Sequence, residues 1–269
     1  MSITIVPVSG LGNRMRVVAS AVVAAPHVEG GIRVVWQPAW DCKASFNDLF
    51  LPLGKDEGVE IERGSLLDAP ATKQNLLIPL LLRKRRYDAE YRCFRPEADF
   101  HLPDFVGQRR VYMDTCYALG PYEAGDVRRV FRPVPELQER IVATTSKFAP
   151  TTIGVHIRRK DNLKAIRYSP LTAFRKRIDG LLASGEAESV FLCTDDDHVK
   201  QYFREIYGKR LITRRVNTNR NSADGIRDAV VDLYSLAATN HIIGSYYSSF
   251  SETAAELSDA SFEVMRENH

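Results

Sequence analysis

The sequence has no apolar run that approaches the roughly 20 residues of a membrane-spanning helix. We also expect no secretory signal, because Met1 leads directly into a β-branched segment without a charged region, an apolar region or a cleavage site. Its four cysteines, Cys42, Cys93, Cys116 and Cys193, never have the C-x-x-C spacing of zinc and redox motifs. We therefore expect a cytoplasmic protein with reduced thiols.

An excess of charge of one sign is absent as well, since 37 lysines and arginines oppose 34 aspartates and glutamates, for a net charge of +3. We therefore expect no nucleic-acid partner, although the balance is compatible with a cationic cleft for a phosphate-bearing ligand. With 269 residues, of which 44 % are hydrophobic, the chain can form one large or two small domains with substantial cores.

Two glycines, but not three, occur in the turn SGLGN at residues 9–13. The turn links a strand-like segment, 2–8, to apolar residues with helical spacing. A dinucleotide-binding turn would have a third glycine in place of Met15, and a phosphate-binding P-loop would contain Gly-Lys-Ser or Gly-Lys-Thr. Gly10 and Gly12 could adopt positive φ or allow a ligand to approach, so this turn fits an ordinary strand–helix connection or a ligand loop.

Strand-like and helix-like segments alternate along the chain, which predicts an α/β protein with parallel, doubly wound sheets. The expected strands are 2–8, 32–38, 59–64, 109–115, 151–159, 189–194, 210–215 and 241–245. The expected helices are one that follows the glycine turn within 8–24, a short one within 41–50, 73–93, about twelve residues after Pro133 and Pro135, 169–184 with Ser169 as N-cap, 197–207, 223–239 and 252–262. The helix after Pro133 is expected to join two domains.

Polar residues follow four of the expected strands, at the carboxyl edge where ligands of such sheets bind. They are SGLGN, HIRRKD (156–161), TDDD (194–197) and SYYSSFS (245–251). The strand period of two places His156 and Arg158 on one face and Arg159 on the other. Adjacent arginines can bind phosphate oxygens through their planar guanidinium groups, or they can form structural ion pairs with Asp161 or Asp195.

The acidic and hydroxyl-rich segments also permit two interpretations each. Asp195 and Asp197 could hold a divalent cation against a diphosphate, but we favour capping of the helix that begins at Asp197. The segment SSFS could present hydroxyls and the first N–H groups of a helix to an anion, or it could supply an ordinary N-cap at Ser251.

Together and in this order, GLGN, GVHIRRKD, FLCTDD, DAVVDLYSLAATNHIIGS and SSFSETAAEL resemble the inverting GDP-fucose-dependent fucosyltransferases. That superfamily includes the α1,6-, α1,2-, bacterial nodulation and protein O-fucosyltransferases. The resemblance covers the first 25 residues and most of 150–258, and it leaves 51–140 unmatched. It implies two facing Rossmann-like domains, a compact version of the GT-B glycosyltransferase type, with the acceptor bound by 1–132 and the GDP-sugar by 133–269.

The resemblance further implies a donor, GDP-fucose, an oligosaccharide or glycolipid acceptor, and a reaction that needs no metal or other cofactor. His156 and Asp232 would contact guanine. Arg158 would bind the β-phosphate, and Ser248 or Ser249 would bind the phosphates. The remaining implied donor residues are Arg159, Asp195 and Asp196, and the cleft loop comprises Gly10, Gly12, Asn13 and Arg14.

The chemistry of these residues agrees with the implied roles. Negative charge grows on the diphosphate as the bond to the sugar breaks, and a fixed arginine such as Arg158 can stabilise it. Guanine presents N1–H and N2–H₂ side by side, and one carboxylate, that of Asp232, can accept both. A carboxylate on a helix could equally lie on the solvated surface.

The general base is left open, because residues 162–167 contain no carboxylate where the α1,6 enzymes have a glutamate and a lysine that serve the acceptor hydroxyl. Asp161, Asp41 or Asp48 could act, or the reaction could be dissociative and need little base catalysis. The alternatives are a non-catalytic nucleotide-sugar sensor, a transferase that uses another GDP-sugar, and a dehydrogenase, which the missing third glycine disfavours.

The segment NLLIPLLLRKRRY (75–87) sets an apolar run against the basic cluster 83–86. It could bind peripherally to an anionic membrane, which would suit a lipid-linked acceptor. The alternative is a core helix with a solvated basic end, and Pro79 interrupts any continuous amphipathic face.

Overall fold

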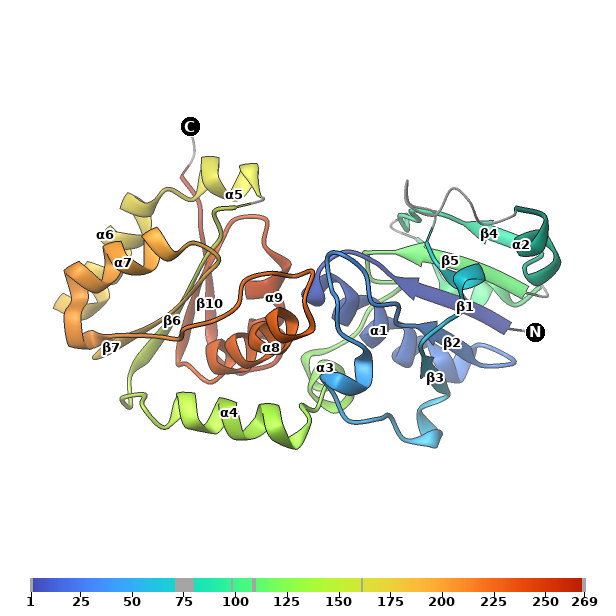
Figure 1. Ribbon diagram of the computed structural model, residues 1–269, viewed down its shortest axis with the longest axis horizontal. Coiled ribbons are helices and arrows are strands. Elements are labelled where there is room, and N and C mark those ends of the chain that lie inside the picture. The colour runs from blue at the N-terminus through green and yellow to red at the C-terminus, as the bar shows by residue number, and fades with distance from the viewer. Residues whose placement is uncertain (1, 71–79, 98, 108–109, 161, 268–269) are drawn as a thin grey trace. The chain divides into compact units, whose positions relative to one another are not determined.

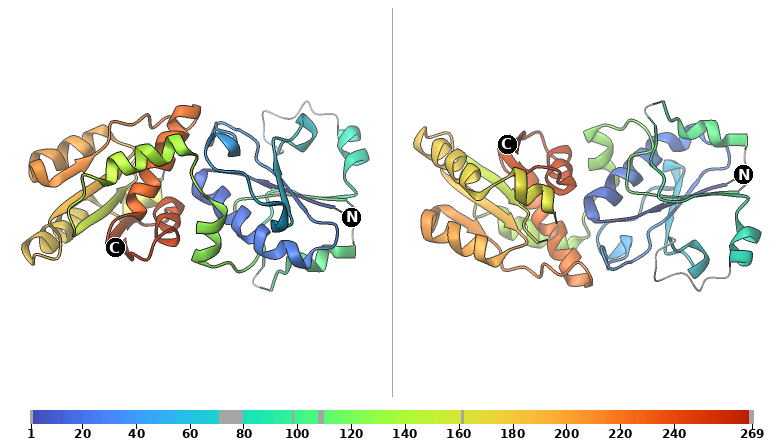
Figure 2. Two further views of the ribbon diagram at one scale, coloured as in Figure 1. Left: turned by 90° about the horizontal axis from the view of Figure 1, so that it is seen from below. Right: turned by 90° about the horizontal axis from the view of Figure 1, so that it is seen from above.

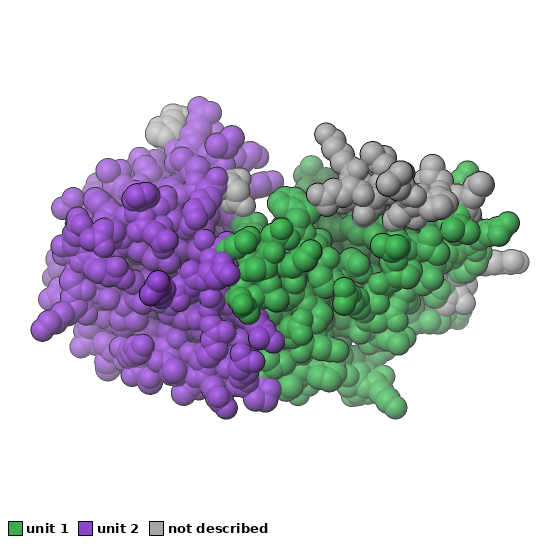
Figure 3. Space-filling view, viewed as in Figure 1, with its two compact units in different colours: residues 1–134, 219–226 green, residues 135–218, 227–269 purple. Residues whose placement is uncertain are grey.

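The computed structural model describes residues 2–70, 80–97, 99–107, 110–160 and 162–267 (Figure 1). The chain divides into two compact units (Figure 3): unit 1 contains Met1–Val134 and Asn219–Ile226, and unit 2 contains Pro135–Thr218 and Arg227–His269. The first division lies two residues beyond the expected 132/133 boundary. The sequence does not predict that Asn219–Ile226 groups with unit 1.

Unit 1 is built on a five-stranded parallel sheet with the order β3-β2-β1-β5-β4. The strands are β1 (Ser2–Pro7), β2 (Ile32–Val35), β3 (Val59–Glu62), β4 (Ala89–Tyr91) and β5 (Arg110–Thr115), and the helices are α1 (Leu11–Ala24), α2 (Leu80–Arg86) and α3 (Ala124–Val130). Short 3₁₀ helices cover Ala25–His27, Phe46–Asp48, Lys55–Glu57, Leu66–Asp68 and Leu102–Gly107. Strand β1 lies at the centre because SITIVP is buried on both faces.

Unit 2 is built on a second five-stranded parallel sheet, with the order β10-β9-β6-β7-β8. Its strands are β6 (Thr152–Ile157), β7 (Ser189–Thr194), β8 (Leu211–Thr213), β9 (His241–Ser245) and β10 (Ser261–Met265). Its helices are α4 (Pro135–Thr145), α5 (Leu163–Tyr168), α6 (Leu171–Ala183), α7 (Asp197–Tyr207), α8 (Ala223–Ala237, which begins in unit 1) and α9 (Ser249–Glu256), with a 3₁₀ turn at Gly208–Arg210.

Helices cover both faces of the unit 2 sheet (Figure 2). Helices α6 and α7 lie on one face, where Phe174 and Phe203 join the main buried cluster, and α8 and α9 lie on the other. Every residue of β6 and β7 is buried, as a central parallel sheet requires. At Gly154 the absence of a side chain admits α8, because a Cβ there would lie 2.6 Å from Cδ1 of Leu236. From β6 the chain adds β7 and β8 on one side, and it then adds β9 and β10 on the other. The strand order therefore reverses between β6 and β9, which defines a ligand position beyond their carboxyl ends.

The predicted elements are largely present, with three corrections. The described part of the expected helix 73–93 contains the short helix α2 and the edge strand β4, while 73–79 lies outside the described residues. The expected helix 252–262 is instead α9 followed by strand β10. Ser169 is not the N-cap of α6, because its Oγ donates to the carbonyl of Met265 (2.6 Å) and accepts from the amide of Tyr246 (2.8 Å).

Two arginines of the basic cluster in α2 form ion pairs within unit 1. The Arg83 side chain is buried, pairs with Glu90 (3.3 Å) and lies over the ring of Tyr112. Arg86 pairs with the buried carboxylate of Asp68 (2.9 Å). Lys84 and Arg85 are exposed. Among the described residues, the length and hydropathy needed to cross a membrane are not reached by any helix.

Candidate functional site

The end of β6 and the end of β9 are joined by the hydroxyl of Ser245. His156 of β6 is the register partner of Gly244 in β9. The Oγ of Ser245 accepts a hydrogen bond from the amide of Arg158 (3.1 Å) and donates to the carbonyl of His156 (3.2 Å). The polar segments 156–161 and 245–251, which the sequence analysis assigned to donor binding, are therefore neighbours at the point where the strand order reverses.

His156 is buried as a neutral imidazole. Burial, together with the positive charge of Arg158, lowers its pKa to about 3. Its Nδ1 lies 3.4 Å from the Oγ of Ser248, and its ring centroid lies 4.7 Å from that of Phe250. At neutral pH this ring can offer a ligand one nitrogen donor or acceptor without bringing a charge.

The two adjacent arginines have different surroundings. The guanidinium of Arg159 donates to the backbone carbonyls of Arg158 (3.4 Å), Ala165 (3.4 Å) and Ser169 (2.5 Å), so it fixes the turn around α5. Asp195 supports the same turn by accepting from the amides of Arg159 (2.8 Å) and Lys160 (3.2 Å). The structure therefore gives Arg159 a backbone-binding role, and its expected contact with the donor stays a prediction. Both arginines are half-buried.

The start of α9 lies beside this turn and carries two serines. Ser248 is the N-cap, without a side-chain capping bond, and Ser249 is the first helical residue. Ser251 is not the N-cap, because it lies within the helix and its Oγ donates to the carbonyl of Ser248 (3.2 Å). Gly244 allows this packing, since a Cβ there would lie 2.6 Å from the Cβ of Ser251. The first N–H groups of α9 thus begin close to the end of β6.

The acidic segment after β7 caps a helix. Asp196 is the N-cap of α7 and accepts from the amide of His198 (2.8 Å), which confirms the capping interpretation one residue earlier than expected. Asp197 has an exposed side chain and pairs with Lys200 (3.1 Å). Within the described part of the chain, no three potential metal-ligating side chains come together.

Asp232 lies on α8 with only 13 % of its side chain exposed, so it is not on the solvated surface. Its Oδ1 accepts from Nη1 of Arg214 at 2.5 Å. Burial raises the pKa of Asp232 to about 6, although the charge and hydrogen bond of Arg214 oppose that rise. Sequence reasoning missed Arg214, although an arginine pair at the end of an expected strand and two carboxylates four residues apart, at 228 and 232, were available as signals.

In the predicted cleft loop of unit 1, positive φ occurs at a serine and not at the two glycines. Positive φ occurs at Ser9 (72°), whereas Gly10 is the N-cap of α1 with a φ of −68° and Gly12 is buried within that helix. Arg14 is buried, and its guanidinium donates to the carbonyls of Ser9 (2.8 Å) and Gln37 (2.7 Å) and to the carboxylate of Asp41 (3.1 Å). These bonds tie two loops together, and the assignment of Arg14 to a cleft stays a prediction.

Asn13 of that loop is half-buried, and its Nδ2 donates to the Oγ of Ser9 (3.0 Å). This bond still leaves the amide oxygen as an acceptor and one N–H as a donor. The assignment of Asn13 to a cleft remains a prediction.

Two of the candidate general bases, Asp41 and Asp48, are bound to other groups of the protein. Asp41 neutralises Arg14, and the carboxylate of Asp48 accepts from the amide of Ser45 (3.0 Å) at the start of a 3₁₀ helix. Asp161 lies outside the described residues. Two of the three candidates therefore have structural partners of their own.

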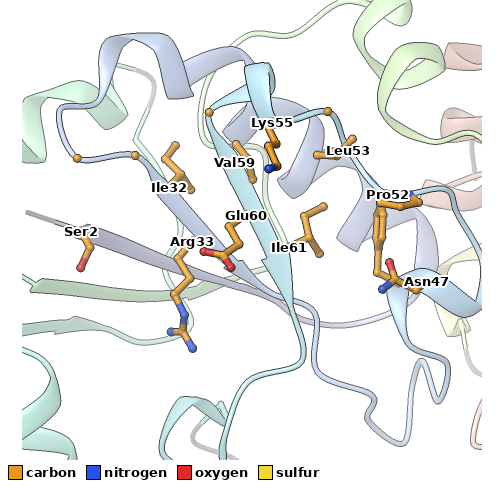
Figure 4. A pocket seen from close by; sticks show the side chains of 15 residues that line it. Ser2, Ile32, Arg33, Asn47, Pro52, Leu53, Lys55, Val59, Glu60 and Ile61 are labelled. Atoms are coloured by element: carbon orange, nitrogen blue, oxygen red, sulfur yellow. The ribbon is translucent and has the colours of Figure 1, made fainter.

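A pocket of about 610 Å³ lies in unit 1 between the beginnings of β2 and β3 and the segment 52–58 (Figure 4). None of the predicted site residues lines it. Its arginine, Arg33, has its guanidinium bound to Asp68 (3.1 Å) and Glu62. The pocket therefore offers a ligand little unpaired charge from that side chain.

No protein-family model matches the sequence, and no curated protein matches it. Solved structures do share its fold. One is NodZ α-1,6-fucosyltransferase soaked with GDP-fucose, with a TM-score of 0.63 and 18 % identity over 96 % of this chain and 92 % of that one. Fucosyltransferase NodZ from Bradyrhizobium has a TM-score of 0.61 and 17 % identity, covering 96 % and 93 %. POFUT1 in complex with GDP has a TM-score of 0.59 and 12 % identity, covering 98 % of each chain.

At these identities the likeness establishes the fold, which consists of two Rossmann-like units of the GT-B type. The chain thus has the fold of the GDP-fucose-dependent fucosyltransferases, which is the superfamily that its motifs resemble.

Proposed function

We propose that this protein is an inverting glycosyltransferase that transfers fucose from GDP-fucose to a glycan hydroxyl. The observation that carries the proposal is the junction of β6 and β9, where a neutral buried histidine, Arg158 and the start of α9 meet. These groups suit a nucleoside diphosphate, because a guanidinium and helix N–H groups bind phosphate oxygens. The shared fold with proteins whose structures contain GDP or GDP-fucose supports the same donor.

In this proposal the nucleoside binds on the side of α8. The carboxylate of Asp232 accepts N1–H and N2–H₂ of guanine, and the neutral ring of His156 supplies one further hydrogen bond. Adenine presents an acceptor at N1 and no amino group at C2, so it cannot satisfy the same carboxylate. This explains a preference for GDP-sugars over ADP-sugars.

The diphosphate binds Arg158, Ser248 or Ser249, and the first amides of α9. Charge on the leaving diphosphate grows as the bond to fucose breaks, and these fixed donors stabilise the transition state more than the ground state. They supply positive charge where other glycosyltransferases use a metal ion, so we infer that the reaction is metal-independent.

The acceptor is an oligosaccharide or a glycolipid, and we assign it to residues 1–132. Asp161 is the proposed general base, because Asp41 and Asp48 already have structural partners. If no base acts, a dissociative path with late proton loss applies. A glycolipid acceptor fits peripheral membrane contact through Lys84 and Arg85 in α2 and the apolar residues before them.

The test is a thermal-shift and calorimetric panel of GDP, GDP-fucose, GDP-mannose, ADP and NAD, followed by an assay for free GDP and fucosylated product. We expect GDP and GDP-fucose to bind, NAD and ADP not to bind, and GDP-fucose to be consumed in the presence of a suitable glycan. Binding without hydrolysis or transfer would favour a nucleotide-sugar sensor. The structural partners of Asp41 and Asp48 support this candidate, because they engage two of the possible general bases.

A further inference from the structure

Arg214 donates a short hydrogen bond to the carboxylate of Asp232. Its Nη1 lies 2.5 Å from Oδ1 of Asp232 and 3.2 Å from the carbonyl of Asp228, and its Nη2 lies 3.1 Å from Oδ1 of Asp228. One guanidinium therefore bridges two carboxylates that are one helical turn apart on α8. Both carboxylates and the arginine have only 13–14 % of their side chains exposed.

The position of Arg214 is itself fixed by Asp228. That carboxylate also accepts from the amide of Asn217 (2.8 Å) and pairs with Arg140 of α4. The arginine is thus held between the segment after β8, helix α8 and, through Asp228, helix α4. It cannot leave Asp232 without also breaking its contacts with Asp228.

This arrangement leaves part of the hydrogen-bonding capacity of the Asp232 carboxylate unused. Among the described residues, Arg214 is the one donor to its oxygens, which leaves Oδ2 and the second lone pair of Oδ1 available. These are the two acceptors that guanine N1–H and N2–H₂ require.

We propose that Arg214 is a positioning residue that keeps Asp232 ionised and oriented as a double acceptor, and that it thereby sets the preference of this site for guanine. The proposal rests on the proposed function, because it deepens the role of Asp232 in binding the nucleoside. A protonated Asp232 would present an O–H donor to the N–H donors of guanine, and the two would repel each other.

The charged groups around Asp232 explain why Arg214 decides its protonation. Lys200 of α7 and Arg214 lower the pKa of Asp232, Asp228 of α8 raises it, and Cys193 of β7 is a buried neutral thiol whose Sγ lies 3.7 Å from the Asp232 carbonyl. Burial already brings the pKa of Asp232 to about 6 with the arginine present. Without the arginine the pKa would rise further, towards neutral pH.

The test measures GDP, IDP and ADP binding from pH 5.5 to 9 for the wild-type protein and for Arg214→Gln and Arg214→Lys. IDP lacks the amino group at C2, so the GDP-to-IDP ratio reports the contact to N2. In the wild type we expect GDP binding to weaken below about pH 6, as Asp232 takes up a proton. For Arg214→Gln we expect the midpoint of that loss to rise by about one unit or more. A rise of one unit should lower the affinity about twofold at pH 7 and a rise of two units about tenfold, and in both cases the affinity should recover towards pH 9.

Two controls separate positioning from simple structural damage. Arg214→Lys keeps the positive charge and should move the midpoint less than Arg214→Gln does. Arg175→Gln makes the same change at an exposed arginine of α6 and should leave nucleotide binding unchanged. The titration of Asp232, followed by ¹³C NMR of labelled aspartates and assigned with Asp232→Asn, reports the pKa without any ligand.

The outcomes are distinguishable. A wild-type protein that binds GDP no better than ADP overturns the proposed function and the guanine role together. Normal guanine preference with an unmoved midpoint in Arg214→Gln, or the same loss of affinity at every pH, overturns the positioning role of Arg214 alone.

Discussion

Two adjacent arginines show how far a single residue's role depends on its surroundings. Arg158 and Arg159 are indistinguishable as residue types, and only the strand period separates their faces. In the folded chain Arg159 binds three backbone carbonyls, whereas Arg158 belongs to the face that carries His156. The two should therefore fail in different ways when replaced.

Arg158→Ala should lower kcat by roughly 10² to 10³, the scale for loss of one preorganised donor to a developing negative charge, while the melting temperature changes little. Arg158→Lys should restore little activity because the planar fork is lost. Arg159→Ala should instead lower the melting temperature, since three carbonyls lose their donor. The measurements are steady-state kinetics and thermal unfolding of all three variants. Near-normal turnover of Arg158→Ala would show that this arginine is structural.

Asp232→Asn should weaken GDP binding by about 1–3 kcal/mol, because an amide can accept from only one guanine donor and turns its own N–H₂ towards the other. ADP binding should change little, so the preference for guanine should fall. Isothermal titration with both nucleotides checks this. Unchanged GDP affinity would place Asp232 outside the nucleoside pocket.

His156 and Asp232 should oppose each other in the pH dependence of stability. The pKa of His156 is lowered from 6.5 to about 3, so its contribution is present above pH 6.5 and is lost as the pH falls. The pKa of Asp232 is raised from 3.8 to about 6, so its contribution is present below pH 3.8 and is lost as the pH rises through 6. Between about pH 4 and 6 the two effects largely cancel.

We therefore expect Asp232→Asn to lose about 2 kcal/mol of unfolding free energy between pH 7.5 and pH 5, compared with a smaller loss for the wild type. His156→Gln should instead gain stability on the same acidification. Urea unfolding at the two pH values measures both variants against the wild type. Equal slopes for all three proteins would contradict the assigned protonation states.

At the scale of elements, the packing of α9 on β9 positions the amides that we propose bind the diphosphate. Gly244→Ala would put a Cβ 2.6 Å from the Cβ of Ser251, so the helix would have to move. We expect a lower melting temperature and weaker GDP binding together. The matched control is Gly180→Ala within α6, where no atom lies within 4 Å of the added carbon. That change should stabilise the protein by about 0.4–1 kcal/mol and leave GDP binding unaltered.

The sequence predicted the long central elements because their patterns are local. Strand β6 is a short run of mainly apolar residues, and helix α8 has apolar residues at helical spacing. Neither pattern needs a partner to be recognised. The edge strand β4 and residues 261–262 of β10 fall within expected helices, since AEY and SFEVM become strands only by pairing with β5 and β9. The burial of Arg14 and the contact between Arg214 and Asp232 were missed for the same reason, because both join residues at least 18 positions apart.

At the scale of the whole molecule, the chain enters each unit twice. Unit 1 includes Asn219–Ile226, where the amide of Lys43 donates to the carbonyl of Arg220 (3.1 Å), and α8 continues from this segment into unit 2. A single boundary near 132 is what the composition predicts, because the proline-rich segment there is visible in the sequence. The grouping of Asn219–Ile226 with unit 1 depends on contacts between residues far apart in the sequence, which no local pattern predicts.

At the same scale, the proposed fucosyl transfer should not depend on a divalent metal. In the segment TDDD, each carboxylate has a protein partner: Asp195 accepts from two backbone amides, Asp196 caps α7, and Asp197 pairs with Lys200. A cation would have to displace these partners, whereas Arg158 and the start of α9 already offer positive charge to a diphosphate. We expect full fucosyl transfer in the presence of EDTA, and GDP binding with the same affinity with and without Mn²⁺. Activity that EDTA abolishes and Mn²⁺ restores would instead make Asp195 and Asp197 metal ligands, and Asp197→Asn should then remove the response to Mn²⁺.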